Sequence, residues 1–332
     1  MSQPIIEVTN LVKTYGDVRA VDGISFQVAE GDFFGFLGPN GAGKTTTMRV
    51  LATLLRKTEG DVRVAGFDVD RQPDEVRRAI GFAMQDVTLD SLASGYENLQ
   101  LLGVLYGLTP KQSRARAEEL IEMVGLTKVA ARWVNSYSGG MRRRLDLAGV
   151  LMHSPRLLFL DEPTQGLDPA ARRTIWDYLR KLNGDGSTIF LTTHHMEEAD
   201  TLCRDLAFID RGKIVERGSP AQLKAQMGGD VIAMQFAEDA SLDQVKKKIA
   251  ALVGADGNVT ASDGQLTLAA PNGGELVPRL IQSLDEIGAA PIAISISQPS
   301  LEDVFVKLVG HSILDDEAQL VQGRDPFVEG RR

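Results

Sequence analysis

The stretch Phe33-Phe34-Gly35-Phe36-Leu37-Gly38-Pro39-Asn40-Gly41-Ala42-Gly43-Lys44-Thr45 decides the fold class of this 332-residue chain. Its first five residues are apolar on both faces, which predicts a buried parallel strand. The glycines that follow match the phosphate-binding loop, and Thr45 to Leu55 has the apolar spacing of a helix. Strand, glycine loop and helix in this order predict backbone N–H groups gathered around phosphate oxygens at a helix N-terminus.

Three side chains at the end of this phosphate loop have predicted roles. Lys44 is expected to reach the β- and γ-phosphates, and Thr45 to hold Mg²⁺ through its hydroxyl. Thr46 has two interpretations, a contact to the α-phosphate or a helix residue that bonds its own backbone. We therefore expect a nucleoside triphosphate with Mg²⁺, held by contacts from Gly38, Pro39, Asn40, Gly41, Ala42, Gly43, Lys44, Thr45 and Thr46.

Two further apolar strands end in polar residues. One strand, residues 157–160, precedes Asp161 and Glu162, and the other, residues 188–191, precedes Thr192-Thr193-His194. Because parallel strands present their carboxyl ends at one edge of the sheet, both sets should lie beside the phosphate loop. Asp161 is expected to bind Mg²⁺ through its waters, and Glu162 to act as general base on the attacking water.

A second anion cradle is predicted at Ser138, Gly139 and Gly140, because these residues precede a helical pattern from Arg142 to Met152. One chain seldom needs two cradles for one nucleotide. The cradle of one copy is therefore expected to close over the γ-phosphate held by the phosphate loop of another copy. Arg142, Arg143 and Arg144 lie where a helix dipole disfavours cations, so an acidic neighbour such as Asp146 is expected to offset them.

The rest of the chain suggests two folded units and a tail. Residues 5–28 alternate like an antiparallel sheet, whereas residues 87–134 have helical spacing, so domain 1–228 should combine a parallel sheet, an antiparallel N-terminal sheet and a helical subdomain. Glycines at 228 and 229 mark a boundary. The order strand, helix, strand, strand, helix, strand over 229–310 predicts a small ferredoxin-like α+β domain with a regulatory or dimerisation role. Residues 311–332 are expected to form a flexible tail.

Composition excludes several classes of function. The net charge of −9 and the aromatic content of 6% argue against a general nucleic-acid or anionic-lipid binder. The sequence has no uncharged apolar run of about 18 residues and no N-terminal signal pattern, so we expect neither a membrane span nor secretion. The single cysteine, Cys203, excludes an internal disulfide framework.

Four motifs occur in one order along the chain: the phosphate loop, the serine-glycine cradle, the Leu-Asp-Glu-Pro strand end and the Thr-Thr-His strand end. Through them, over about residues 5–225, the chain resembles an ATP-binding-cassette ATPase. The resemblance implies the fold of a P-loop NTPase, ATP and Mg²⁺ as cofactors, and roles for four residues. Tyr15 resembles the aromatic that stacks on adenine, and Gln85 the glutamine that links Mg²⁺ and the water site to a transmembrane partner. Asp168 resembles the aspartate of the loop that crosses the dimer interface, and His194 the switch histidine at the γ-phosphate.

The chain is also similar to a subgroup, the daunorubicin-resistance type of bacterial drug-export ATPase, through Tyr137-Ser-Gly-Gly-Met-Arg-Arg-Arg-Leu-Asp146 and Pro299-Ser-Leu-Glu-Asp-Val-Phe305. It departs from the commonest family pattern at Tyr137, Met141 and Gln165-Gly166. The resemblance implies a homodimer joined through its nucleotide sites and bound to a separate transmembrane permease. It places the chain at the cytoplasmic face of the plasma membrane, with membrane contact through the permease only and no nucleic-acid partner.

Other functions stay open at this point. A related ATPase could act on ribosomes or in DNA repair without a permease, although such relatives carry two cassettes or long coiled coils, and this chain has one cassette and no heptad run. The chain could also be a nucleotide-sensing regulator whose C-terminal unit binds a small ligand. Among exporters, a lipid, glycan or ion is an alternative cargo to a drug.

Overall fold

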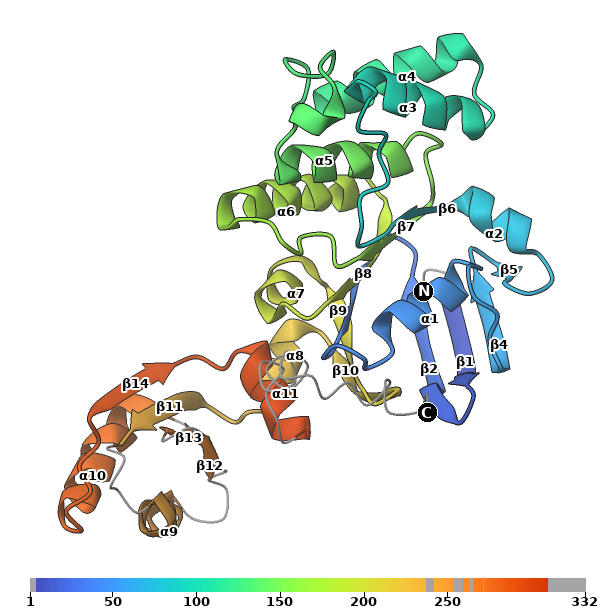
Figure 1. Cartoon of the computed structure of the whole chain (residues 1–332). Coiled ribbons are helices and arrows are strands. Elements are labelled where there is room, and N and C mark those ends of the chain that lie inside the picture. Colours follow the sequence, from blue (N-terminus) through green and yellow to red (C-terminus); the bar gives the residue numbers. More distant parts are fainter. Residues whose placement is uncertain (1–3, 237–241, 254–258, 263–264, 271, 310–332) are drawn as a thin grey trace, which may run out of the picture. The chain divides into compact units, whose positions relative to one another are not determined.

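The computed structural model describes residues 4–236, 242–253, 259–262, 265–270 and 272–309 (Figure 1). Within these ranges the chain divides into two compact units, which meet in sequence between Ser219 and Pro220. The first unit begins with the strands β1 (Pro4–Tyr15), β2 (Val18–Ala29), β3 (Phe33–Leu37), β4 (Glu59–Val64), β5 (Phe67–Asp68) and β6 (Ile80–Ala83), and the helices α1 (Lys44–Leu51) and α2 (Pro73–Ala79).

The strands of the first unit form two sheets. The first sheet is antiparallel, in the order β2-β1-β4-β5, as expected for the N-terminal residues. The second sheet has the order β10-β9-β3-β8-β7-β6, and it includes β7 (Leu157–Asp161), β8 (Thr188–Thr193), β9 (Asp205–Asp210) and β10 (Lys213–Gly218). All its neighbouring strands are parallel except β9 and β10. The predicted fold class of a P-loop NTPase is confirmed.

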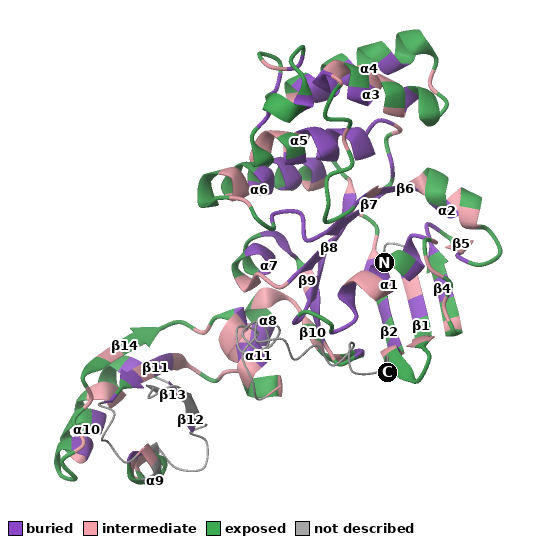
Figure 2. Ribbon diagram, viewed as in Figure 1, coloured by how far each residue is buried: buried purple, intermediate pink, exposed green. Residues whose placement is uncertain are grey.

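Aromatic packing joins the two sheets. Phe26 of β2 stacks on Phe34 and Phe36 of β3, with ring centroids 5.8 and 5.6 Å apart. Phe190 of β8 contacts the same rings, and every residue of β3, β7 and β8 is buried. Figure 2 shows this continuous buried zone through the second sheet. Complete burial explains why these strands are apolar on both faces instead of alternating.

Helices dominate the chain between β6 and β8. They are α3 (Gly95–Leu105), α4 (Pro110–Met123), the short 3₁₀ helix η1 (Val134–Ser136), α5 (Gly139–Val150) and α6 (Pro169–Gly184). Capping boxes fix the starts of two of them, because Ser94 and Thr109 exchange hydrogen bonds with Glu97 and Gln112. Helix α7 (Met196–Leu202) follows β8, and in Figure 1 it lies on the opposite side of the second sheet from α1.

The carboxyl ends of β3, β6, β7 and β8 lie side by side, because these four strands run in parallel within one sheet. We call this border the carboxyl edge. Each of these strands leads into a segment that carries predicted site residues: the phosphate loop, Gln85, Asp161 with Glu162, and His194. The fold therefore gathers at one border residues that are far apart in the sequence.

The second unit has the predicted ferredoxin-like order. Its sheet runs β12-β13-β11-β14 and is antiparallel throughout, with two helices in the crossovers. Its elements are α8 (Pro220–Ala225), β11 (Asp230–Gln235), α9 (Leu242–Val253), β12 (Val259–Ser262), β13 (Gln265–Ala270), α10 (Gly273–Asp285), β14 (Ala293–Ser297) and α11 (Leu301–Val309). Helix α8 groups with this unit through α11, although the sequence suggested a boundary after it, at 228. The tail expected at 311–332 lies outside the described residues.

Candidate nucleotide-binding site

A cleft of about 910 Å³ opens at the carboxyl edge, beside the start of α1. Its volume is large enough for a nucleotide, since small-molecule sites commonly span about 300–1,000 Å³. Twelve of its fourteen lining residues come from the segment 15–20 and the phosphate loop region, and Gln85 and Glu162 complete the lining. The predicted residues in this lining are Tyr15, Pro39, Asn40, Gly41, Gly43, Lys44, Thr45, Thr46, Gln85 and Glu162.

Glycine is required at two loop positions. Gly43 has a φ of +107°, and a Cβ atom there would lie 2.5 Å from the carbonyl oxygen of Ala20. At Gly38 a Cβ atom would lie 2.0 Å from the carbonyl oxygen of Ile209. Both distances are far below a van der Waals contact. The loop therefore keeps its tight path only without these side chains, and that path is what lets loop N–H groups turn toward an anion.

Lys44 is almost fully buried, with 4% of its surface exposed. Its ammonium donates hydrogen bonds to the carbonyl oxygens of Gly38 (2.7 Å) and Pro39 (3.0 Å) and lies 3.5 Å from Oε1 of Glu162. A buried cation needs such partners, because leaving water uncompensated is costly. The loop thus holds the charge at the place where a phosphate would meet it.

The end of β7 supplies a carboxylate bonded to two hydroxyls. Thr45 donates a hydrogen bond to Oδ1 of Asp161 over 3.1 Å, and Thr192 of β8 donates a short hydrogen bond to the same oxygen. Asp161 is 3% exposed. Hydroxyl and carboxylate oxygens are the ligands that Mg²⁺ prefers, so Thr45 and Asp161 fit the ion predicted for them. Thr192 was not among the predicted site residues.

Glu162 has an unusual backbone conformation, and its carboxylate lies close to Lys44 and His194. Its φ is +46°, in the left-handed region, which non-glycine residues occupy at a cost of about 1–3 kcal/mol, usually at functional sites. Burial raises the pKa of its carboxyl, but the nearby imidazole of His194 and ammonium of Lys44 outweigh burial and lower that pKa below its usual value. Glu162 is therefore an ionised carboxylate in the cleft, as a general base must be.

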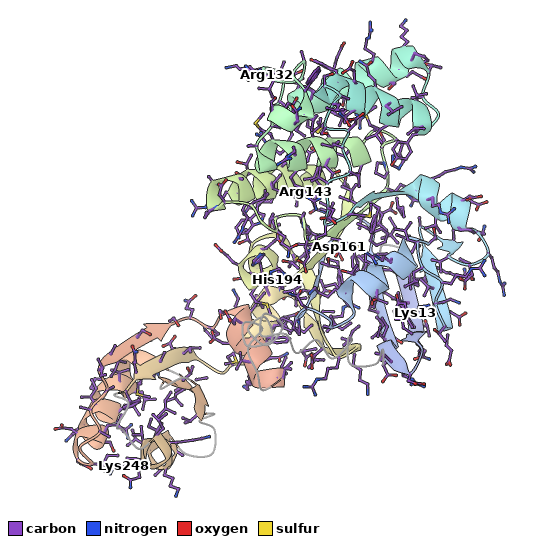
Figure 3. The ribbon with its side chains drawn as sticks, viewed as in Figure 1. Lys13, Arg132, Arg143, Asp161, His194 and Lys248 are labelled. Carbon is purple, nitrogen blue, oxygen red and sulfur yellow. The ribbon has the colours of Figure 1, made fainter. Side chains whose placement is uncertain are left out.

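The two adjacent histidines have different environments. His194 places Nδ1 3.1 Å from Oε2 of Glu162, whereas His195 packs against the His194 ring with centroids 4.1 Å apart. Burial, followed by the electrostatic influence of the neighbouring His194 and Arg172 side chains, lowers the pKa of His195 to about 4. His195 is thus a neutral packing residue near neutral pH, and His194 is the histidine at the carboxyl edge. Figure 3 labels His194 and Asp161 on neighbouring strand ends.

The serine-glycine cradle begins α5, as the sequence predicted. Ser138 is the N-cap of α5, and its hydroxyl accepts a hydrogen bond from the N–H of Met141 over 3.3 Å. Ser138, Gly139 and Gly140 belong to the described part of the chain, and none of them lines the cleft that contains Lys44. Asp168 has a comparable local role, because its Oδ1 accepts hydrogen bonds from the N–H groups of Ala170 and Ala171 and caps α6.

Two side chains have contacts that the sequence did not reveal. The amide nitrogen of Gln85 donates a short hydrogen bond to the amide oxygen of Gln165, one of the residues that departs from the usual pattern. Arg143 of α5 forms the expected ion pair with Asp146, 3.1 Å apart, but it also reaches backbone carbonyls next to Gln85 and Glu162. Such contacts have no local sequence signal, because they join segments distant in the chain.

Comparisons with known proteins agree with this geometry. A family model described as "ABC transporter" matches residues 21–165. The daunorubicin resistance ATP-binding protein DrrA2 of Streptomyces coeruleorubidus is 43% identical over 309 residues, which cover 92% of this chain and 95% of that protein. The chain belongs to the ATP-binding-cassette (ABC) family of transporter ATPases.

Other relatives of this ABC ATPase extend the comparison. The linearmycin resistance ATP-binding protein LnrL of Bacillus subtilis is 33% identical, with 94% of this chain and 100% of the relative covered. A solved dimeric ATP-binding cassette in a post-hydrolysis state, bound to ADP and Pi, has a TM-score of 0.59 and 28% identity, and it covers 64% of this chain and 98% of that one. Cassettes of this family form dimers and work with a separate transmembrane subunit. This ABC ATPase accordingly binds and hydrolyses ATP as the energising subunit of an exporter.

Proposed function

We propose that this ABC ATPase hydrolyses ATP-Mg²⁺ at the interface of two copies, each nucleotide lying between the phosphate loop of one copy and the serine-glycine cradle of its twin. The observation that carries the proposal is the separation of two anion-binding elements within one chain. The cleft of Lys44 already contains the general base, while the cradle starts α5 outside that cleft. Two incomplete half-sites are completed when the copies face each other.

Within each half-site the side chains divide the work. Glu162 accepts a proton from the attacking water, and His194, 3.1 Å away, orients its carboxylate and contacts the γ-phosphate. Lys44 leaves its loop carbonyls for the β- and γ-phosphates, and Tyr15, 48% exposed at the cleft wall, stacks on the adenine. The hydrolytic step then needs only positioning and charge stabilisation, as is usual for phosphoryl transfer.

Thr45, Asp161 and Gln85 are the proposed holders of Mg²⁺. Asp161 and Thr45 already share a hydrogen bond, and Gln85 donates through its amide nitrogen to Gln165, which leaves its amide oxygen available. When bound, the ion would neutralise charge that develops on the β- and γ-phosphate oxygens. Asp168, the N-cap of α6, is proposed to meet the twin subunit through the loop that leads into this helix.

A separate permease is the proposed partner on the helical side of the first unit. Large apolar side chains are exposed on α3, next to its two ends, and at Trp133, whose backbone pairs with Ser94 at the start of α3: Leu92, Leu101, Val104, Leu105, Tyr106 and Trp133. Clustered exposed apolar residues commonly mark a protein interface. No helix within the described residues is long and apolar enough to span a bilayer. We therefore place the chain at the cytoplasmic face of the plasma membrane, attached through the permease.

The proposed cargo is a drug or another hydrophobic compound, because relatives that are 43% and 33% identical carry names of daunorubicin and linearmycin resistance. Selectivity would lie in the permease. The test is ATPase activity of the co-purified complex while candidate compounds are added. Stimulation by hydrophobic antibiotics supports the cargo class, and stimulation only by ions or sugars contradicts it.

The second unit, from Pro220, is proposed to regulate or stabilise the dimer. Truncation before Pro220, at the boundary between the units, tests this role by measuring ATP-dependent dimerisation and ATPase activity. Unchanged values for both would remove the role.

The base assignment is tested by Glu162→Gln in the full chain. This change keeps the shape of the side chain but removes its proton acceptor, so turnover should fall about 10²- to 10⁴-fold while ATP binding persists. A variant that hydrolyses ATP at the wild-type rate would refute the assignment.

A further inference from the structure

Arg143 is a buried cation that forms an ion pair and, in addition, hydrogen bonds to several backbone carbonyls. Its side chain is 5% exposed, and Nη1 lies 3.1 Å from Oδ2 of Asp146, one turn further along α5. That pair alone would neutralise both charges within one helix. A buried ion pair is weak evidence for a stabilising role, since an apolar pair of the same volume is often as stable.

The remaining donors of Arg143 reach three backbone carbonyls outside α5. Nη1 donates to Met84 (2.6 Å), Nε to Pro163 (2.8 Å) and Nη2 to Asp161 (3.4 Å). Met84 immediately precedes Gln85, and Asp161 and Pro163 are the two neighbours of Glu162 in the chain. The guanidinium thus holds the backbone next to Gln85, a proposed Mg²⁺ ligand, and next to Glu162, the proposed general base. Figure 3 shows Arg143 on α5 and Asp161 at the adjacent strand end.

The same helix begins with the cradle. Ser138 caps α5, and Arg143 lies in its second turn, so a rigid helix connects the cradle to the guanidinium. A shift of α5 therefore moves the three carbonyls with it. Arginine suits this role because its planar fork offers five donors in fixed directions, which lysine cannot reproduce.

We propose that Arg143 is a positioning residue that links the cradle of each copy to the hydrolytic residues of the same copy. When the cradle closes on the triphosphate of the twin, α5 and Arg143 set the positions of Gln85 and Glu162. This inference rests on the proposed sandwich dimer. It implies that the two sites hydrolyse ATP cooperatively, since occupancy of one site prepares the other.

The test compares two neighbouring arginines in the full-length protein. Arg143→Lys keeps the charge but loses the fork, so kcat should fall about 10²-fold, the usual effect of a displacement near 1 Å, with KM for ATP changed less than about twofold. The Hill coefficient for ATP should fall to about one. Arg144→Lys is the matched control: Arg144 donates to the carbonyl of Val124 instead, and its variant should retain the wild-type kcat and Hill coefficient.

A second variant keeps the test decisive if Arg143→Lys unfolds. Arg143→Met combined with Asp146→Leu removes both charges together, so no carboxylate is left buried and unpaired. It should fold with a near-normal Tm and still show the low kcat. Wild-type kcat and cooperativity in either variant would overturn the proposal. Loss of folding in both variants would overturn it too, because Arg143 would then be a core residue.

Failure of the proposed function gives a different result. If the wild-type chain hydrolyses ATP with a Hill coefficient of one and Glu162→Gln remains active, the sandwich and the base are wrong. If Glu162→Gln is inactive while Arg143→Lys matches the wild type, only the link through Arg143 is wrong.

Discussion

Oε2 of Glu162 lies 3.1 Å from Nδ1 of His194, and the two side chains are only 7% and 10% exposed. Burial by itself raises the pKa of Glu162, and His194 is the first of the groups that lower it again. The histidine at the end of β8 therefore favours the ionised form of the carboxylate at the end of β7, together with Lys44. Two strand ends that are remote in sequence form one chemical unit.

His194→Ala is expected to reduce kcat about 10²-fold, because the carboxylate loses the group that orients it. Since burial remains and the partner is gone, the pKa of Glu162 should rise. The acidic limb of the kcat–pH profile should then move to higher pH. His153→Ala, at a histidine that contacts the carbonyl of Ile80, is the control and should leave that limb in place. An unmoved limb in His194→Ala would contradict the assignment.

Gly43→Ala should lower ATP affinity at least about tenfold. The added methyl group would lie 2.5 Å from the carbonyl of Ala20, at a φ of +107° that alanine rarely adopts, so the loop must open. Gly184→Ala at the end of α6 meets nothing within 4 Å and serves as the control. Equilibrium binding of a fluorescent ATP analogue measures the effect. Equal affinities for the two variants would show that the tight path of the loop is unnecessary.

Asp161→Asn should raise the Mg²⁺ concentration for half-maximal ATPase activity about 10- to 100-fold. The reason is that a neutral amide has no negative charge to attract the ion, whereas Asp161 is a carboxylate that accepts hydrogen bonds from Thr45 and Thr192. Chelation of Mg²⁺ should stop hydrolysis in the wild type as well. A Mg²⁺ titration that superimposes on the wild-type curve would exclude Asp161 as a ligand.

His195 should make the chain less stable as pH falls. Its folded pKa is about 4 against about 6.5 in the unfolded chain, so between these values the unfolded state binds the extra proton. His194, Arg172 and Lys44 oppose the charged form, and Glu162 favours it. Stability is therefore complete above pH 6.5 and declines toward pH 4. The shift in pKa could lower the free energy of unfolding by at most about 3 kcal/mol. Solvent screening at this partly buried ring reduces that loss to the order of 1 kcal/mol.

His195→Gln removes this titration. Tm measured at pH 7.5 and pH 5 should drop less in the variant than in the wild type. A drop of the same size in both would show that His195 does not titrate in this range.

The strand ends were predictable because their signals are local. Buried parallel strands leave apolar runs, and the polar residues that follow them, Asp161, Glu162 and His194, must meet at one edge. The ferredoxin-like order and the start of α11 also follow from local patterns: Ser300 and Asp303 exchange hydrogen bonds as an N-terminal cap.

Other features depend on tertiary placement and leave no pattern. The positive φ of Glu162 has no signal in the residues around it, and the carbonyls bonded by Arg143 belong to segments 18 to 59 residues away. The sequence-based boundary at 228 assigns helix α8 to the first domain, but the helix contacts α11 and belongs to the second unit. These relations need coordinates, because backbone carbonyls are identical at every position of a sequence.

The most direct test of the shared site combines two inactive variants in one mixed dimer. Lys44→Ala destroys the phosphate loop of one copy, and Ser138→Arg destroys the cradle of the other. Each homodimer then has no intact site, whereas the mixed dimer has one, formed by the loop of the Ser138→Arg copy and the cradle of the Lys44→Ala copy. The measurement is ATP trapped per purified mixed dimer. We predict about one ATP per dimer, and trapping no greater than in the two homodimers would contradict the account.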